Sequence, residues 1–211
     1  MGIYFFSTPA WLQRLFSGWT WRIPPGDEKV IYLTFDDGPM PGPTDFVLEQ
    51  LKSAEAKATF FCIGDNVRKH PGTLQQVLDA GHRVGNHTFN HVRGWGKSTE
   101  DYLSNVDRCA DVLAGSPTRL FRPPYGKITL QQAAALKRRG FQIVMWDVLT
   151  YDFQAELNTS NALQRICRAT RPGSIVVFHD SLKAEPQLRV LLPAYLNFLR
   201  TEGYVMRALP A

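Results

Sequence analysis

The stretch Val30-Ile31-Tyr32-Leu33-Thr34-Phe35-Asp36-Asp37-Gly38-Pro39 decides how the rest of the chain is interpreted. A β-branched and aromatic apolar run, typical of a buried strand, leads into two adjacent carboxylates and a Gly-Pro turn. Charged side chains are almost never fully buried unless they are paired or bind a metal. Asp36 and Asp37 would point to opposite faces of a straight strand, but a turn at Gly38-Pro39 lets both face one site. Taken alone, the stretch is equally compatible with a solvated turn, where Asp is common.

Strand-like and helix-like segments alternate from this point on and predict one α/β domain with a parallel sheet. The expected strands are residues 30–35, 58–63, 82–86, 119–121, 141–146, 174–178 and 204–208. The expected helices are residues 44–54, 66–80, 99–114, 129–139, 161–169 and 190–202, with Pro193 in the first turn of the last one. Seven parallel strands can close into a barrel or form an open sheet, so the pattern leaves both architectures possible.

Polar side chains follow most of the expected strands at the point where each strand ends. The carboxyl ends of parallel strands meet at one edge, where α/β proteins bind their ligands. The residues concerned are Asp36 and Asp37 after the first strand, His87 after the third, Arg122 after the fourth, Asp147 after the fifth, and His179 and Asp180 after the sixth. Polar groups at so many ends predict a site.

His87 and His91 are four residues apart, which would place both imidazoles on one face if the segment were helical. With a carboxylate from elsewhere they would form a two-histidine, one-carboxylate metal site that leaves a position for water. The spacing alone is weak evidence, and the position beside the Asp pair strengthens it. His70 and His82 are interpreted as surface or helix-end residues.

Two other strand ends carry a cation and a histidine that each allow two interpretations. Arg122-Pro123-Pro124-Tyr125-Gly126 combines a stiff backbone with a guanidinium that can bind a carboxylate, and it would equally suit a stiff surface loop. His179 ends the apolar strand 174–178, where it could be a core histidine or a general acid.

Five segments in order resemble the motifs of the NodB-homology polysaccharide deacetylases, carbohydrate esterase family four. They are Thr34-Phe35-Asp36-Asp37-Gly38-Pro39, His87-Thr88-Phe89-Asn90-His91, Arg122-Pro123-Pro124-Tyr125-Gly126, residues 146–153, and Ile175-Val176-Val177-Phe178-His179. The resemblance implies a distorted, incompletely regular (β/α) barrel with about seven parallel strands. It also implies a metal-dependent enzyme that removes N-acetyl groups from an amino-sugar polysaccharide or glycoconjugate.

The resemblance assigns the metal and the base. Asp37, His87 and His91 would hold a divalent metal ion, usually Zn²⁺ in this family. Asp36 would be the catalytic base, and Arg122 would orient it.

The resemblance also assigns the oxyanion donor and the acid. Tyr125 would offer its backbone N–H to the oxyanion, and His179 would protonate the leaving amine. Ile175 and Val177 match apolar positions near the acetyl methyl, although both would serve equally as strand core.

The fourth motif departs from the family pattern of two acids followed by Trp. Leu149 stands at the first acid and Phe153 at the Trp, whereas Asp152 matches the acid that orients the catalytic histidine. Asp147 lies outside the register, so Asp152 is the expected partner of that histidine. The change to Phe153 alters a pocket wall and leaves the family's usual substrate in question.

Composition excludes several other classes. Of the 211 residues, 44% are hydrophobic and 20% charged, which argues against a disordered or fibrous chain. The net charge is +5, but basic runs such as 137–139 are short and typical of helix C-termini, so no nucleic-acid partner is predicted. Cys62, Cys109 and Cys167 are distant from one another and odd in number, so they are expected to pack as small apolar groups in a reducing compartment.

Residues 1–29 form an aromatic N-terminal arm, expected to pack on the domain that residues 30–211 form. The arm lacks a basic segment before Arg14 and its apolar run is interrupted, so neither a signal peptide nor a transmembrane segment is predicted. Aromatic residues at this density either pack on the domain or touch a membrane surface, and packing is favoured. The protein is therefore expected in the cytoplasm or at the periphery of a membrane.

Several rival functions can be compared with N-acetylglucosamine deacetylation of a peptidoglycan-like or chitin-like glycan. A glycan-binding pseudoenzyme would lack a base, an acid or a metal ligand, and the chain has all of them. A phosphotransferase that forms an aspartyl-phosphate would normally have a second acid two residues after the first, and this chain has Gly38 at that position after Asp36. A membrane-surface scaffold would leave the five motifs unused. A deacetylase of a small or non-GlcNAc substrate stays open.

Overall fold

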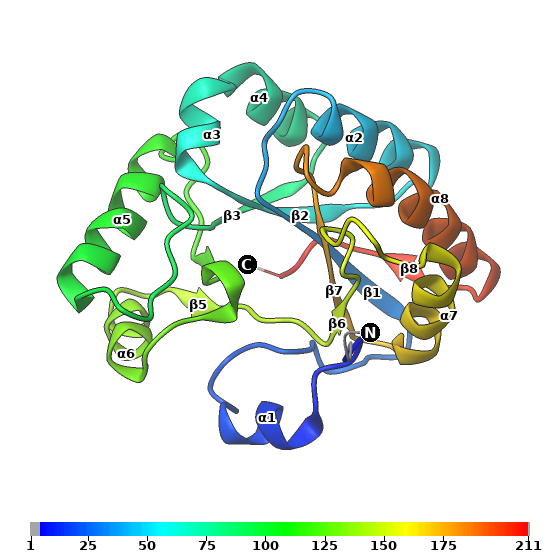
Figure 1. Ribbon diagram of the computed structural model, residues 1–211, viewed down its shortest axis with the longest axis horizontal. Coiled ribbons are helices and arrows are strands. Elements are labelled where there is room, and N and C mark those ends of the chain that lie inside the picture. The colour runs from blue at the N-terminus through cyan, green and yellow to red at the C-terminus, as the bar shows by residue number, and fades with distance from the viewer. Residues whose placement is uncertain (1–4, 211) are drawn as a thin grey trace.

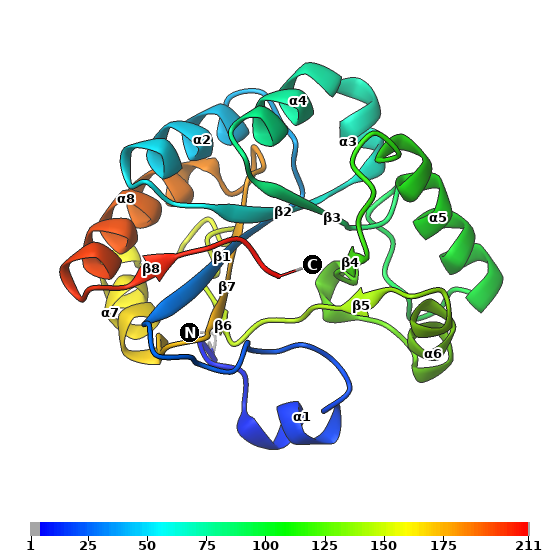
Figure 2. The same ribbon diagram turned by 180° about the vertical axis from the view of Figure 1, so that it is seen from behind.

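The computed structural model describes residues 5–210, and within them eight strands form one parallel sheet. The sheet order is β5-β4-β3-β2-β1-β7-β6, and β8 pairs with the first residues of β1. The strands are β1 (Val30–Asp36), β2 (Ala58–Cys62), β3 (Arg83–Asn86), β4 (Leu120–Phe121), β5 (Gln142–Ile143), β6 (Val148–Leu149), β7 (Ile175–His179) and β8 (Val205–Met206). The sheet curls into an incomplete barrel with the helices outside it (Figures 1 and 2), which confirms the expected distorted barrel.

The helices follow the expected periodicity with two corrections. They are α1 (Ala10–Leu15), α2 (Pro43–Ser53), α3 (Gly64–Lys69), α4 (Pro71–Asp79), α5 (Thr99–Val112), the 3₁₀ turn η1 (Pro124–Gly126), α6 (Leu130–Arg138), α7 (Thr159–Ala169) and α8 (Glu185–Thr201). The expected helix 66–80 is two helices, because the chain turns at His70 and Pro71 starts α4. The last helix begins at Glu185 rather than 190, so Pro193 lies inside it and Pro186 occupies its first turn.

The buried apolar side chains among residues 5–210 form three separate clusters. The largest cluster fills the space between the strands and the outer helices. The smallest cluster consists of Phe61, Leu120, Val144, Ile175 and Leu209. The tail after β8 carries Leu209 to the middle of the ring of strands (Figures 1 and 2), where its N–H donates to Thr59 Oγ1 at 3.0 Å.

The N-terminal arm spans the interval between β5 and β6, which do not pair with each other. Thr20 exchanges backbone hydrogen bonds with Ile143 and Met145, and the N–H of Thr8 donates to the carbonyl of Asp147. Phe6 and Trp21 are buried. The arm therefore supplies backbone partners that a complete barrel would take from a neighbouring strand.

The cysteines and the helix lengths bear on two further expectations. All three cysteines are free; Cys62 and Cys109 are buried, and burial raises their pKa, so they pack as apolar groups as predicted.

Among residues 5–210, no helix combines the length and the apolar character that crossing a bilayer requires.

Candidate active site

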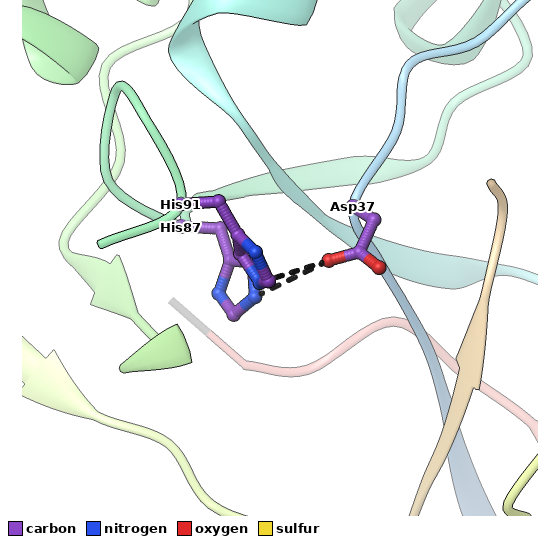
Figure 3. Close-up of side chains that lie close together, drawn as sticks. All are labelled: Asp37, His87 and His91. Atoms are coloured by element: carbon purple, nitrogen blue, oxygen red, sulfur yellow. Dashed lines mark ion pairs between the residues drawn. The ribbon is translucent and has the colours of Figure 1, made fainter. Parts of the chain in front are cut away.

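Three potential metal ligands converge where β1 and β3 end (Figure 3). Asp37 follows β1, and His87 and His91 come from the loop after β3. Asp37 Oδ1 lies 3.7 Å from His87 Nε2 and 3.2 Å from His91 Nε2. The three side chains were predicted to meet, and the structure brings them together.

The backbone that presents these ligands is irregular, and the two histidines are not on a helix. Asp37, Thr88 and His91 have φ of 82°, 63° and 53°, so segment 87–91 is a loop with left-handed residues. Asn86 shapes it, since its Oδ1 accepts from the N–H of Thr88 at 2.9 Å. Left-handed turns, rather than the four-residue spacing of a helix, thus bring the imidazoles together.

The chemistry of this cluster fits a divalent cation. Asp37 Oδ1 is buried and has no hydrogen-bond partner among the described residues. His87 Nδ1 lies 2.8 Å from the carbonyl of Arg122, which fixes the proton on Nδ1 and turns the Nε2 lone pair toward Asp37. Burial, together with the neighbouring His87, lowers the pKa of His91 to about 4, so His91 is neutral at pH 7, as a ligand must be. Two imidazole nitrogens face a buried carboxylate oxygen that has no hydrogen-bond partner among the described residues, and this arrangement suits a cation.

Asp36 and Arg122 form a buried ion pair beside this cluster. Arg122 Nη1 donates to Asp36 Oδ1 at 2.7 Å and to Thr34 Oγ1 at 2.8 Å. The remaining guanidinium nitrogens donate to the carbonyls of Val144 and Met145, and the group lies over the ring of Phe61. Arg122 is fully buried and its hydrogen bonds are satisfied, which excludes the surface-loop interpretation and fixes where Asp36 points.

His179 and Asp152 form the second pair of the site. His179 Nδ1 lies 2.7 Å from Asp152 Oδ1, and the backbone N–H of His179 donates to Asp152 Oδ2 at 2.8 Å. Burial by itself lowers the pKa of His179, but the charge and hydrogen bond of Asp152, helped by Asp36 and Asp37, outweigh it and raise the pKa to about 9. At pH 7 this histidine carries a proton that it can donate.

The four residues expected to contact the substrate differ in how far they lie from the histidines of the site. Phe153 is half-buried and meets His179 edge to face at 4.9 Å between ring centroids. Tyr125 is 62% exposed, has φ of 60° and lies 4.6 Å from the ring of His91. Val177 is buried on β7 two residues before His179, on the same side of the strand, whereas Ile175 packs with the core cluster around Leu209.

Two sequence interpretations are wrong. Asp147 lies before β6, at the opposite end of the strands from the site, where Arg22, Arg171 and Ser174 surround it. His82 follows the end of α4, where its N–H donates to the carbonyl of Val77, but it is buried and not a surface group, and its Nδ1 accepts from the N–H of Ala58 at 3.2 Å.

Sequence analysis assigned no specific role to the groups that hold the peptide between Asp37 and Gly38. Asp180 is fully buried, and its Oδ1 accepts from the N–H of Gly38 at 3.0 Å. Asn66 Nδ2 donates to the carbonyl of Asp37 at 2.7 Å, and the N–H of Ile63 donates to that of Gly38. A Cβ at Gly38 would lie 2.0 Å from Asp180 Oδ2, so only glycine fits. The position of Asp180 after a strand was a usable signal, whereas nothing marked Asn66.

The fold is a curled parallel barrel, and its site has a His-His-Asp cluster between a buried Asp–Arg pair and a His–Asp pair. This combination is expected for a carbohydrate esterase of the NodB-homology type. The comparisons agree. Residues 24–144 match the family model for polysaccharide deacetylase. The chain belongs to the polysaccharide deacetylase family.

Individual relatives place the chain within that family. It is 34% identical to a peptidoglycan-N-acetylglucosamine deacetylase of Bacillus cereus, over 88% of each chain. It is 32% identical to a chitooligosaccharide deacetylase of Azorhizobium caulinodans, over 87% of this chain and 94% of the relative. The crystal structure of the Bc1960 peptidoglycan N-acetylglucosamine deacetylase superposes with a TM-score of 0.87 at 26% identity, over 96% of this chain and 95% of that one.

Proposed function

We propose that the protein is a metal-dependent hydrolase that removes N-acetyl groups from an N-acetylated amino-sugar glycan of the peptidoglycan or chitin type. The observation that carries the proposal is the unpartnered, buried Oδ1 of Asp37 facing two imidazole nitrogens. The Asp36–Arg122 pair, which would supply the base, and the His179–Asp152 pair, which would supply the acid, flank it. The relatives' activities supply the substrate class.

Asp37, His87 and His91 would hold the metal. Two nitrogens and one oxygen are a donor set that suits Zn²⁺ and leaves room for water. When bound, such an ion lowers the pKa of water and polarises a carbonyl group. The hydrogen bond from His87 to the Arg122 carbonyl keeps the ligating nitrogen unprotonated.

Asp36 would act as the general base. Its ion pair with Arg122 holds the carboxylate in a fixed direction. The second oxygen is available to take a proton from the attacking water. Tyr125, held in a left-handed turn next to His91, would present its backbone N–H to the developing oxyanion.

His179 would act as the general acid. An amide nitrogen leaves only when it is protonated, and Asp152 keeps that proton on His179 at neutral pH. Phe153 packs against the same ring, and Val177 lies next to it on the strand. These two positions would shape the acetyl pocket, and Phe153 favours a substrate that differs from that of relatives with Trp there. A small or non-GlcNAc acetamido sugar is the second candidate for this reason.

The test is acetate release from N-acetylglucosamine oligomers, peptidoglycan and small N-acetylated sugars by the Zn²⁺-loaded protein. Asp36→Asn serves as the blank, since it should keep the metal and lose turnover about 10²–10⁴-fold. His91→Ala should lose both metal and turnover, measured by Zn²⁺ content after dialysis. Full activity of Asp36→Asn would show that the base is assigned wrongly. Metal binding without acetate release from any substrate would favour a glycan-binding pseudoenzyme.

A further inference from the structure

The N-terminal arm has an exposed side that neither the fold nor the proposed chemistry uses. Its inner side chains, among them Phe6 and Trp21, pack on the barrel. On α1, Trp11 and Leu15 are each 66% exposed. Trp11 and Leu15 are four residues apart on α1, so both lie on one face of the helix, and α1 has no buried residue.

The charges around this side have one sign. All nineteen acidic residues of the protein come after Gly26, so the part of the arm up to Gly26 contains none. Arg14 is exposed between Trp11 and Leu15, and Lys137 Nζ from α6 would lie 2.6 Å from a Cβ on Gly18. No ion pair holds Arg14 or Lys137 to an acid among residues 5–210, so both cations face solvent. We call Trp11, Arg14, Leu15 and Lys137 the arm face.

We propose that the arm face binds the headgroup region of an anionic lipid bilayer. Trp and Leu side chains next to Arg and Lys are the composition of segments that lie in a membrane interface. The absence of acids removes the repulsion that anionic headgroups would otherwise exert. A second copy of the same chain would have to bring the same cations against these ones, which disfavours self-association through this face.

The position of the arm face suits this partner. Figure 1 places α1 at the outer edge of the molecule, between α6 and α7, away from the ends of β1 and β3 where the metal ligands lie. Contact with a bilayer through α1 would therefore leave the site uncovered. Deacetylation would then take place close to a membrane surface.

The test is flotation of the intact protein with vesicles of phosphatidylcholine, with and without phosphatidylglycerol. The wild type should float with the mixed vesicles, and Trp11→Ser with Leu15→Ser should weaken binding about tenfold or more. The matched control replaces exposed residues of the same types elsewhere, Trp95→Ser with Leu182→Ser, and should bind as the wild type does. Equal loss in the control would place the lipid contact on another face and overturn the proposal.

A charge test separates the arm face from the overall positive charge. Arg14→Glu with Lys137→Glu should reduce binding to the mixed vesicles by about fivefold or more per cation. Lys52→Glu with Arg200→Glu changes the net charge equally at exposed positions on α2 and α8 and should have little effect. No flotation of the wild type, or a dimer in sedimentation that Trp11→Ser with Leu15→Ser abolishes, would also overturn the proposal. Binding is measured without any substrate, so the result does not depend on the proposed activity.

Discussion

Two fully buried carboxylates lie at opposite ends of β6, and they have opposite kinds of partner. Asp147 directly precedes the strand and binds Arg22, Arg171, Ser174 and Gln13. Asp152 follows the strand and binds both ring and backbone of His179. The partners of Asp147 are two arginines and two neutral side chains, none of which titrates near pH 7, whereas Asp152 holds a histidine that can gain and lose a proton.

This difference shows that burial and pairing alone do not identify a catalytic acid. By both criteria Asp147 ranks as high as Asp152. The end of the strand and the titration behaviour of the partner distinguish them, because the carboxyl ends of barrel strands carry chemistry and the amino ends carry stability. Substitutions at the two positions should therefore change different quantities.

Asp152→Asn should have the largest effect on turnover. Asparagine keeps the size but removes the charge that supports the protonated His179, so kcat should fall about 10²–10³-fold. Zn²⁺ content should stay the same, because Asp152 is not among the grouped metal ligands. Acetate release and metal analysis of the same preparation check this, and a loss below tenfold would contradict the assigned role.

Asp147→Asn should have the largest effect on stability. The change leaves buried Ser174 and the neighbouring arginines without their carboxylate, at a cost of about 3 kcal/mol in the free energy of unfolding. Turnover at a temperature where the variant is folded should match that of the wild type. Urea unfolding and acetate release measure the two quantities, and a catalytic defect in the folded variant would break the distinction between the two ends of β6.

The pH dependence of stability should also separate the two carboxylates. The pKa of His179 is raised from 6.5 to about 9, so its pair with Asp152 stabilises the fold fully below pH 6.5 and loses this contribution as the pH rises through about 9. In metal-free protein, the stability gap between wild type and Asp152→Asn should narrow over that range. The gap for Asp147→Asn should stay constant, since arginine does not titrate there.

Arg171→Gln should have the smallest effect. The side chain of Arg171 is 48% exposed, so its ion pair with Asp147 is screened by solvent and worth about 1 kcal/mol or less. Asp147 keeps Ser174, Gln13 and Arg22. A urea midpoint close to that of the wild type is expected, and a loss as large as that of Asp147→Asn would mean that this one pair dominates the cluster.

The misplacement of Asp147 shows where sequence patterns stop being informative. The apolar run 141–146 predicts one strand, which would put Asp147 at its carboxyl end. Gln142 and Ile143 pair with β4, and the N–H of Val144 still donates to Phe121 of that strand. The N–H of Met145 donates instead to Thr20 in the N-terminal arm, and a new strand starts at Val148. Partners distant in sequence decide where a strand ends, and local periodicity does not contain them.

The site was predictable to the extent that its residues stand at strand ends. Asp36, Asp37, His87 and His179 could be placed because a parallel sheet fixes where each strand delivers its last side chain. The loop geometry of His91 was not predictable, because left-handed φ values at Thr88 and His91 depend on tertiary contacts. Asn66 was missed for the same reason, since an exposed-looking helix residue gives no sign that it bonds the carbonyl of Asp37.

The tail that carries Leu209 into the ring of strands bears on how the protein matures. Every residue of the candidate site lies between Asp36 and Asp180, so all of them precede Leu209 in the chain. Without Leu209, Phe61 and Ile175 would lack a neighbour with which they pack. A domain folds as a unit, so the strands that carry the catalytic groups complete their packing only after the segment with Leu209 has been synthesised.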